Sequence, residues 1–288
     1  MGSDEVGIIY KHNHGPALEE ARKLAGWFEK KGIGVYLEEM IPKEPSDLLE
    51  PSSVVPSTVK WVVVIGGDGT LLGAARRVGR YGAPILGVNL GGLGFLTSIP
   101  LELLYPMVES MVAGELEIES RMTLKASVIR NELEVCSSHF LNDIVINKSA
   151  LARIIDLQVE VDGESLTVFR ADGLIVSTPT GSTAYNLAAG GPVVHPSMET
   201  LIFTPICAFT LSNRPIIIPK TVTVCITMAK ESEEAVMLTF DGQVGFDLHF
   251  GDRVVISNSG YRIKLFRAPG RSYFDILRTK LMWGGGRP

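Results

Sequence analysis

The 288-residue sequence lacks the features that mark several specialised protein classes. Its three cysteines form no Cys-x-x-Cys pair, which argues against a zinc site and a disulfide framework. It has no Lys/Arg run and a net charge of −5, which argues against a nucleic-acid partner. Its longest apolar stretch, 201–219, is interrupted by Pro205, Arg214 and Pro215 and therefore predicts no membrane span. The acidic N-terminus is unlike a signal peptide, so we expect a soluble cytoplasmic protein with no membrane partner.

Several nucleotide-binding motifs are also absent. No GxxxxGK[ST] pattern occurs, which excludes a P-loop NTPase, and the glycine-rich signature set of protein kinases is missing. A dinucleotide-binding fingerprint places an acidic residue about 20 positions after its glycines to bind a ribose. Here that position falls in 84–89, which has no acid. A Rossmann dehydrogenase is therefore disfavoured.

The sequence does contain a strand, a glycine turn and a helix in succession. Residues 61–65 are apolar and mostly β-branched, and an apolar helical pattern follows Thr70. The turn between them, Gly66-Gly67-Asp68-Gly69-Thr70, is typical of a phosphate-binding loop, because glycines let the backbone approach an anion at a helix N-terminus. A carboxylate at Asp68 suits a proton acceptor or a group facing phosphate-bound Mg²⁺. The alternative is a tight turn in which Asp68 caps the helix.

The chain divides by pattern near residue 119. Before it, strands and helices alternate, which predicts an α/β domain with a parallel sheet over 1–119. After it, strand-like runs predict a mainly β, sandwich-like domain over 120–269, with hairpin turns at Asp162-Gly163 and Asp241-Gly242. A helix over 270–283 is expected to pack back on the first domain. The predicted β runs are 123–130, 141–147, 154–161, 165–170, 173–178, 206–211, 221–228, 236–240, 253–257 and 261–265.

Three further segments carry polar residues of possible function. Asn142-Asp143 begins an apolar strand, so the two side chains are expected on opposite faces, one for a ligand and one for the backbone; a strand-initial Asx turn is the alternative. Small residues from 178 to 183 precede Tyr185, which suits a flat base, although an ordinary loop-to-helix junction has the same composition. The run 214–219 is explained by an edge strand.

Six motifs together resemble the NAD kinase family of bacterial type: GGDGT (66–70), LND (141–143), ADG (171–173), TPTGSTAY (178–185), RPIIIP (214–219) and FDGQ (240–243). GGDGT alone is shared with phosphofructokinases and with diacylglycerol and sphingosine kinases, but its combination with TPTGSTAY is specific. The resemblance implies transfer of the ATP γ-phosphoryl group to the adenosine-ribose 2′-hydroxyl of NAD, with Mg²⁺ or another divalent cation. It also implies the two-domain fold shared with diacylglycerol kinases, in a homodimer or homotetramer.

The resemblance assigns roles to residues position by position. Asp68 is the implied general base, with Gly69 beside the substrate and Gly66, Gly67 and Thr70 completing the phosphate-binding loop. Asp143 replaces a Glu found in many relatives, which shortens the acid by one methylene. No side chain is assigned as a metal ligand. The remaining implied NAD-binding residues are Asn142, Asp143, Arg153, Arg170, Asp172, Thr183, Ala184, Tyr185, Asn186, Leu187, Ala188 and Gln243.

Two other functions share part of this pattern. A lipid or sugar kinase has the GGDGT turn but would lack TPTGSTAY, and a lipid kinase would also need a membrane-docking surface. A non-catalytic NAD(H) sensor has the same scaffold, although an intact Asp68 argues against it. An assay with ATP, Mg²⁺ and either NAD or a diacylglycerol distinguishes these possibilities.

Overall fold

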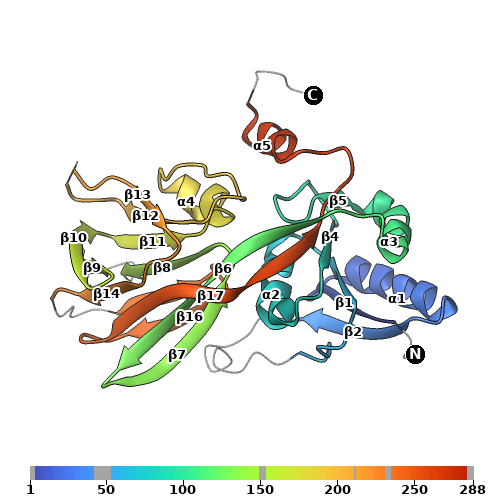
Figure 1. Cartoon of the computed structure of the whole chain (residues 1–288), viewed down its shortest axis with the longest axis horizontal. Helices are drawn as coiled ribbons and strands as arrows, with labels where there is room; N and C mark the ends of the chain where they lie inside the picture. The colour runs from blue at the N-terminus through green and yellow to red at the C-terminus, as the bar shows by residue number, and fades with distance from the viewer. Residues whose placement is uncertain (1–3, 42–52, 149–153, 211, 231–234, 284–288) are drawn as a thin grey trace. The chain divides into compact units, whose positions relative to one another are not determined.

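A computed structural model describes residues 4–41, 53–148, 154–210, 212–230 and 235–283 of the chain. It forms two compact units. Unit 1 contains the described residues within Met1–Pro42, Ser52–Ser120 and Ile263–Pro288, and unit 2 contains those within Arg121–Arg262. Figure 1 shows the elements of both units along the chain.

The sheet of unit 1 is parallel, in the order β2-β1-β3-β4, with β5 beside β4. Its central strand, β3, is buried along its whole length, as its continuous apolar run predicts. The last part of β17 joins this sheet through Leu265, which is paired with Ile85. The strands are β1 (Glu5–Lys11), β2 (Gly34–Met40), β3 (Trp61–Ile65), β4 (Ile85–Asn89), β5 (Ile99–Pro100) and β17 (Arg253–Phe266).

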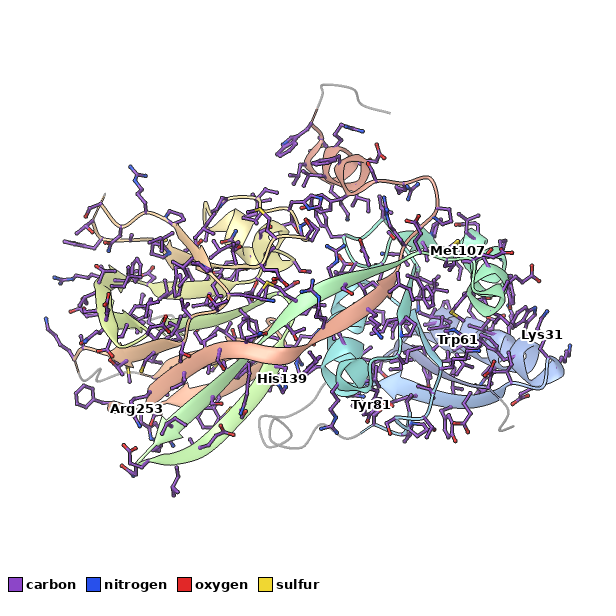
Figure 2. The ribbon with its side chains drawn as sticks, in the orientation of Figure 1. Lys31, Trp61, Tyr81, Met107, His139 and Arg253 are labelled. Atoms are coloured by element: carbon purple, nitrogen blue, oxygen red, sulfur yellow. The ribbon has the colours of Figure 1, made fainter. Side chains whose placement is uncertain are left out.

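Helices cover both faces of this sheet. Helices α1 and α3 share one apolar core with alternate residues of β1 and β3, including Trp61, and with Met107 of α3 (Figure 2). Helix α2 contacts β1, β3 and β4 from the other side (Figure 1). Gly114, with φ of 75°, ends α3 in the left-handed conformation that glycine favours. The helices are α1 (Gly15–Lys30), α2 (Asp68–Val78), α3 (Leu104–Ala113) and α5 (Tyr273–Leu281).

Unit 2 consists of two sheets packed on one apolar core. The first has the order β10-β9-β14-β17, with β6 on β17 and β7 on β6. The second is antiparallel, in the order β13-β12-β11-β8-β15-β16. The first comprises β17 with β6 (Ile118–Arg130), β7 (Leu133–Phe140), β9 (Ile155–Val161), β10 (Glu164–Ala171) and β14 (Val224–Met228). The second comprises β8 (Asp143–Lys148), β11 (Gly173–Ser177), β12 (Thr200–Ile206), β13 (Ile216–Pro219), β15 (Val236–Phe240) and β16 (Val244–Leu248).

The α/β fold of the N-terminal part and the β-rich fold of the C-terminal part are confirmed, as is the edge position of β13. The prediction of a strand over 206–211 is wrong, because β12 ends at Ile206 and Cys207 adopts a left-handed φ of 47°. The separate strands predicted at 253–257 and 261–265 are one strand, β17. Strands β5, β7 and β16 were not predicted, nor was β12 apart from Ile206.

Candidate functional site

The glycine turn of unit 1 connects β3 directly to α2. Helix α2 begins at Asp68, and its N-cap, Gly67, has no side-chain capping bond. Gly66 must lack a side chain, because a Cβ there would lie 2.4 Å from the Thr70 hydroxyl oxygen. Because the N-cap of α2 is Gly67, the alternative prediction that Asp68 caps the helix is wrong.

The Asp68 carboxylate instead binds the loop that follows β4. Its Oδ1 accepts hydrogen bonds from the Leu96 N–H (3.1 Å), the Thr97 N–H (2.9 Å) and the Thr97 hydroxyl (2.8 Å). Its Oδ2 accepts one, from the Phe95 N–H (2.9 Å). A carboxylate has about four acceptor positions, two on each oxygen. Oδ2 is therefore the oxygen with acceptor capacity left for a substrate proton.

Two other residues complete this network. Thr97 is fully buried, and its hydroxyl accepts a hydrogen bond from the Asn89 amide (2.7 Å) while it donates to Asp68. The other end of the Asn89 amide accepts from the Gly91 N–H (2.7 Å). A Cβ on Gly94 would lie 2.1 Å from Asp68 Oδ1, so only glycine permits this approach. The loop thus fixes the orientation of the carboxylate.

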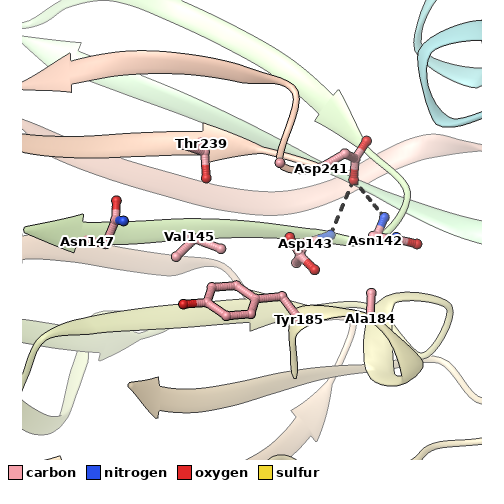
Figure 3. A pocket seen from close by; sticks show the side chains of 9 residues that line it. Asn142, Asp143, Val145, Asn147, Ala184, Tyr185, Thr239 and Asp241 are labelled. Carbon is pink, nitrogen blue, oxygen red and sulfur yellow. Dashed lines mark hydrogen bonds between the residues drawn. The ribbon is translucent and has the colours of Figure 1, made fainter. Parts of the chain in front are cut away.

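A pocket of about 250 Å³ lies in unit 2, on the face of the second sheet that points away from the core (Figure 3). Alternate residues of β8 line it, namely Asp143, Val145 and Asn147, while Ile144 and Ile146 face the core. The register, with Val145 opposite Thr239, brings β15 to the same face. Asn142, Ala184, Tyr185, Asp241 and Gly242 complete the lining.

The backbone before β8 is held from two sides. The Asp241 carboxylate accepts from the N–H groups of Leu141 (3.2 Å), Asn142 (2.8 Å) and Asp143 (3.3 Å). The Thr178 hydroxyl donates to the Leu141 carbonyl (2.6 Å), and the Thr178 N–H donates to the Asn142 carbonyl (2.9 Å). Strand β8 begins at Asp143, so Asn142 precedes it and both side chains line the pocket. The prediction that they face opposite sides of a strand is therefore wrong, and the backbone anchor is Asp241.

The polar groups of this pocket are unusually buried. Asp143 is 4% exposed, and burial, followed by the negative charge of Asp241, raises the pKa of its carboxyl group to about 7. Asn147 Oδ1 is buried and has no hydrogen-bond partner among the described residues. The Tyr185 ring lies across the pocket from β8 and is 46% exposed (Figure 3). An acid that carries a proton near neutral pH and an unsatisfied acceptor suit a ligand with N–H and O–H groups.

The segment around α4 (Tyr185–Ala188) is held by its own polar side chains. Asn186 is fully buried, and its amide donates to the carbonyls of Ser182 and Pro192, both at 3.1 Å. Its oxygen accepts from the Thr204 hydroxyl (2.6 Å). Asn186 therefore supports the wall on which Ala184 and Tyr185 lie.

Of the predicted NAD-binding residues, the pocket brings together Asn142, Asp143, Ala184 and Tyr185. The other described ones in unit 2 do not line it. Asp172 pairs with Lys148 (3.6 Å), and Arg170 pairs with Asp156 (3.7 Å). Arg153 lies outside the described residues. The other predicted NAD-binding residues of unit 2 that do not line the pocket are Thr183, Asn186, Leu187, Ala188 and Gln243.

Comparison with known proteins decides the family. Residues 6–116 match the model of the ATP-NAD kinase N-terminal domain, and residues 141–268 match that of the C-terminal domain. The NAD kinase of Geobacter sulfurreducens is 47% identical over 281 residues, which cover 96% of this chain and 98% of that protein. The chain belongs to the NAD kinase family. An NAD kinase of Solibacter usitatus is 44% identical over 280 residues, which cover 97% of each chain.

Two solved structures, an NAD kinase and an NADH kinase, show the same fold. An Archaeoglobus fulgidus NAD kinase in complex with ATP has a TM-score of 0.74 at 25% identity, covering 96% of this chain and 98% of that one. Yeast NADH kinase complexed with NADH has a TM-score of 0.84 at 22% identity, covering 99% and 89%. NAD kinases phosphorylate NAD to NADP with ATP, so this chain is an ATP-dependent kinase with NAD and ATP as its substrates. Within the described residues, no helix is long and apolar enough to cross a bilayer.

Proposed function

We propose that the pocket of unit 2 binds NAD and that Asp68 is the general base for the adenosine-ribose 2′-hydroxyl. The observation that carries the proposal is the hydrogen bonding of Asp68, which leaves acceptor capacity on Oδ2 while three donors occupy Oδ1. The 2′-hydroxyl proton moves to Asp68 Oδ2, and the 2′-oxygen forms a bond to the γ-phosphorus. The bond from that phosphorus to the β,γ-bridging oxygen breaks, and ADP leaves.

The proposed roles of the two parts of the chain follow. Residues 1–119, with the helix at 270–283, would supply phosphate binding through Gly66, Gly67, Gly69 and Thr70. The first-turn N–H groups of a helix lack acceptors within the helix and favour an anion. Residues 120–269 would bind NAD. The proposal includes the predicted NAD-binding residues of this part of the chain that do not line the pocket. Phosphoryl transfer depends mainly on alignment and charge neutralisation, which these groups provide.

The divalent cation is proposed to arrive with the nucleotide as MgATP. Among the described residues, no group of three or more His, Cys, Asp and Glu side chains is placed to hold a metal ion. Mg²⁺ commonly keeps several waters and binds substrate phosphates with few protein ligands. The proposal therefore places the metal with the ATP phosphates and assigns no side chain of this chain as its ligand.

We also propose a cytoplasmic homodimer or homotetramer. The exposed apolar side chains of Leu133 (69%), Phe209 (62%) and Phe250 (54%) are candidates for contacts with other copies. All three cysteines are free thiols, which supports a reducing compartment. Size-exclusion chromatography with light scattering measures the oligomeric state, and a monomer at micromolar concentration would contradict the proposal.

An NAD analogue that lacks the adenosine-ribose 2′-hydroxyl tests the proposed reaction. With purified protein and MgATP, this analogue is expected to inhibit competitively against NAD without being phosphorylated. The matched analogue lacking the 3′-hydroxyl is expected to remain a substrate. Phosphorylation of the 2′-deoxy analogue, or of a diacylglycerol offered in place of NAD, would contradict the proposal.

A further inference from the structure

The turn between β15 and β16 carries a carboxylate, that of Asp241, which lines the pocket. Asp241 is only 8% exposed, although it lies in the three-residue turn, Asp241 to Gln243, between β15 and β16, where polar side chains are ordinarily solvated. We propose that Asp241 is a positioning residue for NAD binding, which fixes the Asn142–Asp143 backbone and whose charge controls the proton on the Asp143 carboxyl group. This inference rests on the proposal that the pocket binds NAD.

The backbone contacts join two segments that are about 100 residues apart in the sequence. Asp241 Oδ1 accepts from the N–H groups of Asn142 and Asp143 (Figure 3). The Asp241 N–H donates to the Asp143 carbonyl (2.8 Å). The opposite side of this segment is fixed by Thr178 and by Gly181, where a Cβ would lie 2.2 Å from the Asn142 carbonyl oxygen. Asn142 and Asp143 therefore have little freedom to move when a ligand binds.

These contacts do not by themselves require a negative charge. Asp241 and Gly242 have φ of 49° and 62°, as in a type I′ turn, and Asn tolerates this conformation as well as Asp does. The side-chain oxygen of an Asn would accept the same backbone N–H groups. Asp241 differs from an Asn at this position by its negative charge. That charge lies in the pocket that Asp143 also lines.

The surroundings of Asp143 leave Asp241 as the main charge that acts on it. Burial is the largest cause of its raised pKa, which is about 7, and the charge of Asp241 is the second. Strands β11 and β15, which flank β8, carry no ionisable side chain. The other titratable or charged groups on the elements packed around this site are Tyr185 of α4, Lys148 at the far end of β8, Glu134, Cys136 and His139 of β7, and Asp247 of β16.

This arrangement makes NAD binding depend on pH near neutrality. With its proton, the Asp143 carboxyl group both donates and accepts hydrogen bonds. Without it, the pocket presents a second negative charge to a dinucleotide whose pyrophosphate is anionic, and binding weakens. The KM for NAD is therefore expected to rise as the pH passes through about 7, the pKa of Asp143.

The test is the pH profile of the KM for NAD in the wild type and in Asp241→Asn. The variant keeps the turn and the acceptor oxygen but loses the charge, so the midpoint is expected to move down by on the order of one pH unit. Asp247→Asn is the matched control, because it removes a charge from the same hairpin at an exposed position and should leave the midpoint unchanged. An unchanged midpoint in Asp241→Asn would overturn the role of Asp241 in NAD binding.

A ligand-free titration separates this inference from the proposed function. The carbon-13 resonance of the Asp143 carboxyl group, assigned through Asp143→Asn, is expected to titrate near pH 7 in the wild type and lower in Asp241→Asn. If the resonance shifts but the KM profile does not, the assignment of NAD to this pocket is wrong and the effect of Asp241 on Asp143 stands. If the resonance does not shift in a folded Asp241→Asn protein, the role of Asp241 is disproved.

Discussion

The backbone N–H of Thr97 donates a hydrogen bond of 2.9 Å to the carboxylate of Asp68, 29 positions earlier in the chain. This contact joins the start of α2, which follows β3, to the loop after β4. Strands β3 and β4 are neighbours in the sheet. A carboxylate on a helix N-terminus would otherwise rotate among several conformations. Here four donors from residues 95–97 restrict it to one. The catalytic proposal depends on this restriction.

Replacing Gly94 with Ala tests the restriction directly. The added Cβ would lie 2.1 Å from Asp68 Oδ1, so the carboxylate or the loop must move. We expect kcat to fall by at least about tenfold, because misplacing a catalytic group by about 1 Å can cost on the order of 100-fold. Gly92→Ala in the same loop is the control, since a Cβ there meets nothing within 4 Å. Equal kcat values in the two variants would contradict the role given to Gly94.

Thr97→Val removes the hydroxyl that links Asp68 to Asn89. The buried Asn89 amide then loses its acceptor and Asp68 loses one donor. We expect the free energy of unfolding to fall by about 1–3 kcal/mol, the usual cost of a buried polar group without a partner. Urea denaturation measures this change. Thr97→Ser keeps the hydroxyl and should retain more stability than the Val variant; the reverse order would show that the methyl group matters more than the hydrogen bonds.

Asp143→Asn should change how stability depends on pH. The folded-state pKa of Asp143 is raised from 3.8 to about 7, so the folded protein holds a proton that the unfolded chain releases. Wild-type stability therefore decreases as the pH rises from about 4 to about 7 and is then constant, with a total cost of about 4 kcal/mol. Because Asn carries no charge, the variant should avoid this loss. Denaturation at pH 5 and at pH 8 gives the free energy of unfolding of the variant minus that of the wild type. This difference should be larger at pH 8 than at pH 5, and an equal difference at both pH values would contradict the raised pKa of Asp143.

The glycine turn of unit 1 was predicted from the sequence, whereas Asn89, Gly94 and Thr97, which orient Asp68, were not. A continuous apolar run followed by Gly66–Thr70 predicts a buried strand, a turn and a helix, because each is encoded locally. The turn at Asp241-Gly242 was also predicted as a hairpin, which β15 and β16 confirm. Its role in the pocket was missed, since it depends on pairing with β8, about 100 residues away.

The same reason explains why Asn147 and Thr239 were not identified as pocket residues. Their places follow from strand alternation and from a register that no local pattern fixes, with Val145 opposite Thr239. The error at 206–211 had a different cause. An apolar run marks burial but not where a strand ends, and Cys207 ends β12 through its left-handed backbone.

Asp68→Asn, measured for both turnover and NAD affinity, tests the central claim most directly. The Asn oxygen retains the three donors at the Oδ1 position, but its amide group meets the Phe95 N–H and cannot accept a proton. Thr97→Val, which loosens the same carboxylate without removing it, measures how much of any effect comes from lost anchoring. We predict that Asp68→Asn lowers kcat by about 10²–10⁴-fold, more than Thr97→Val does, while the Kd for NAD changes by only about threefold or less. A near wild-type kcat in Asp68→Asn would contradict the account.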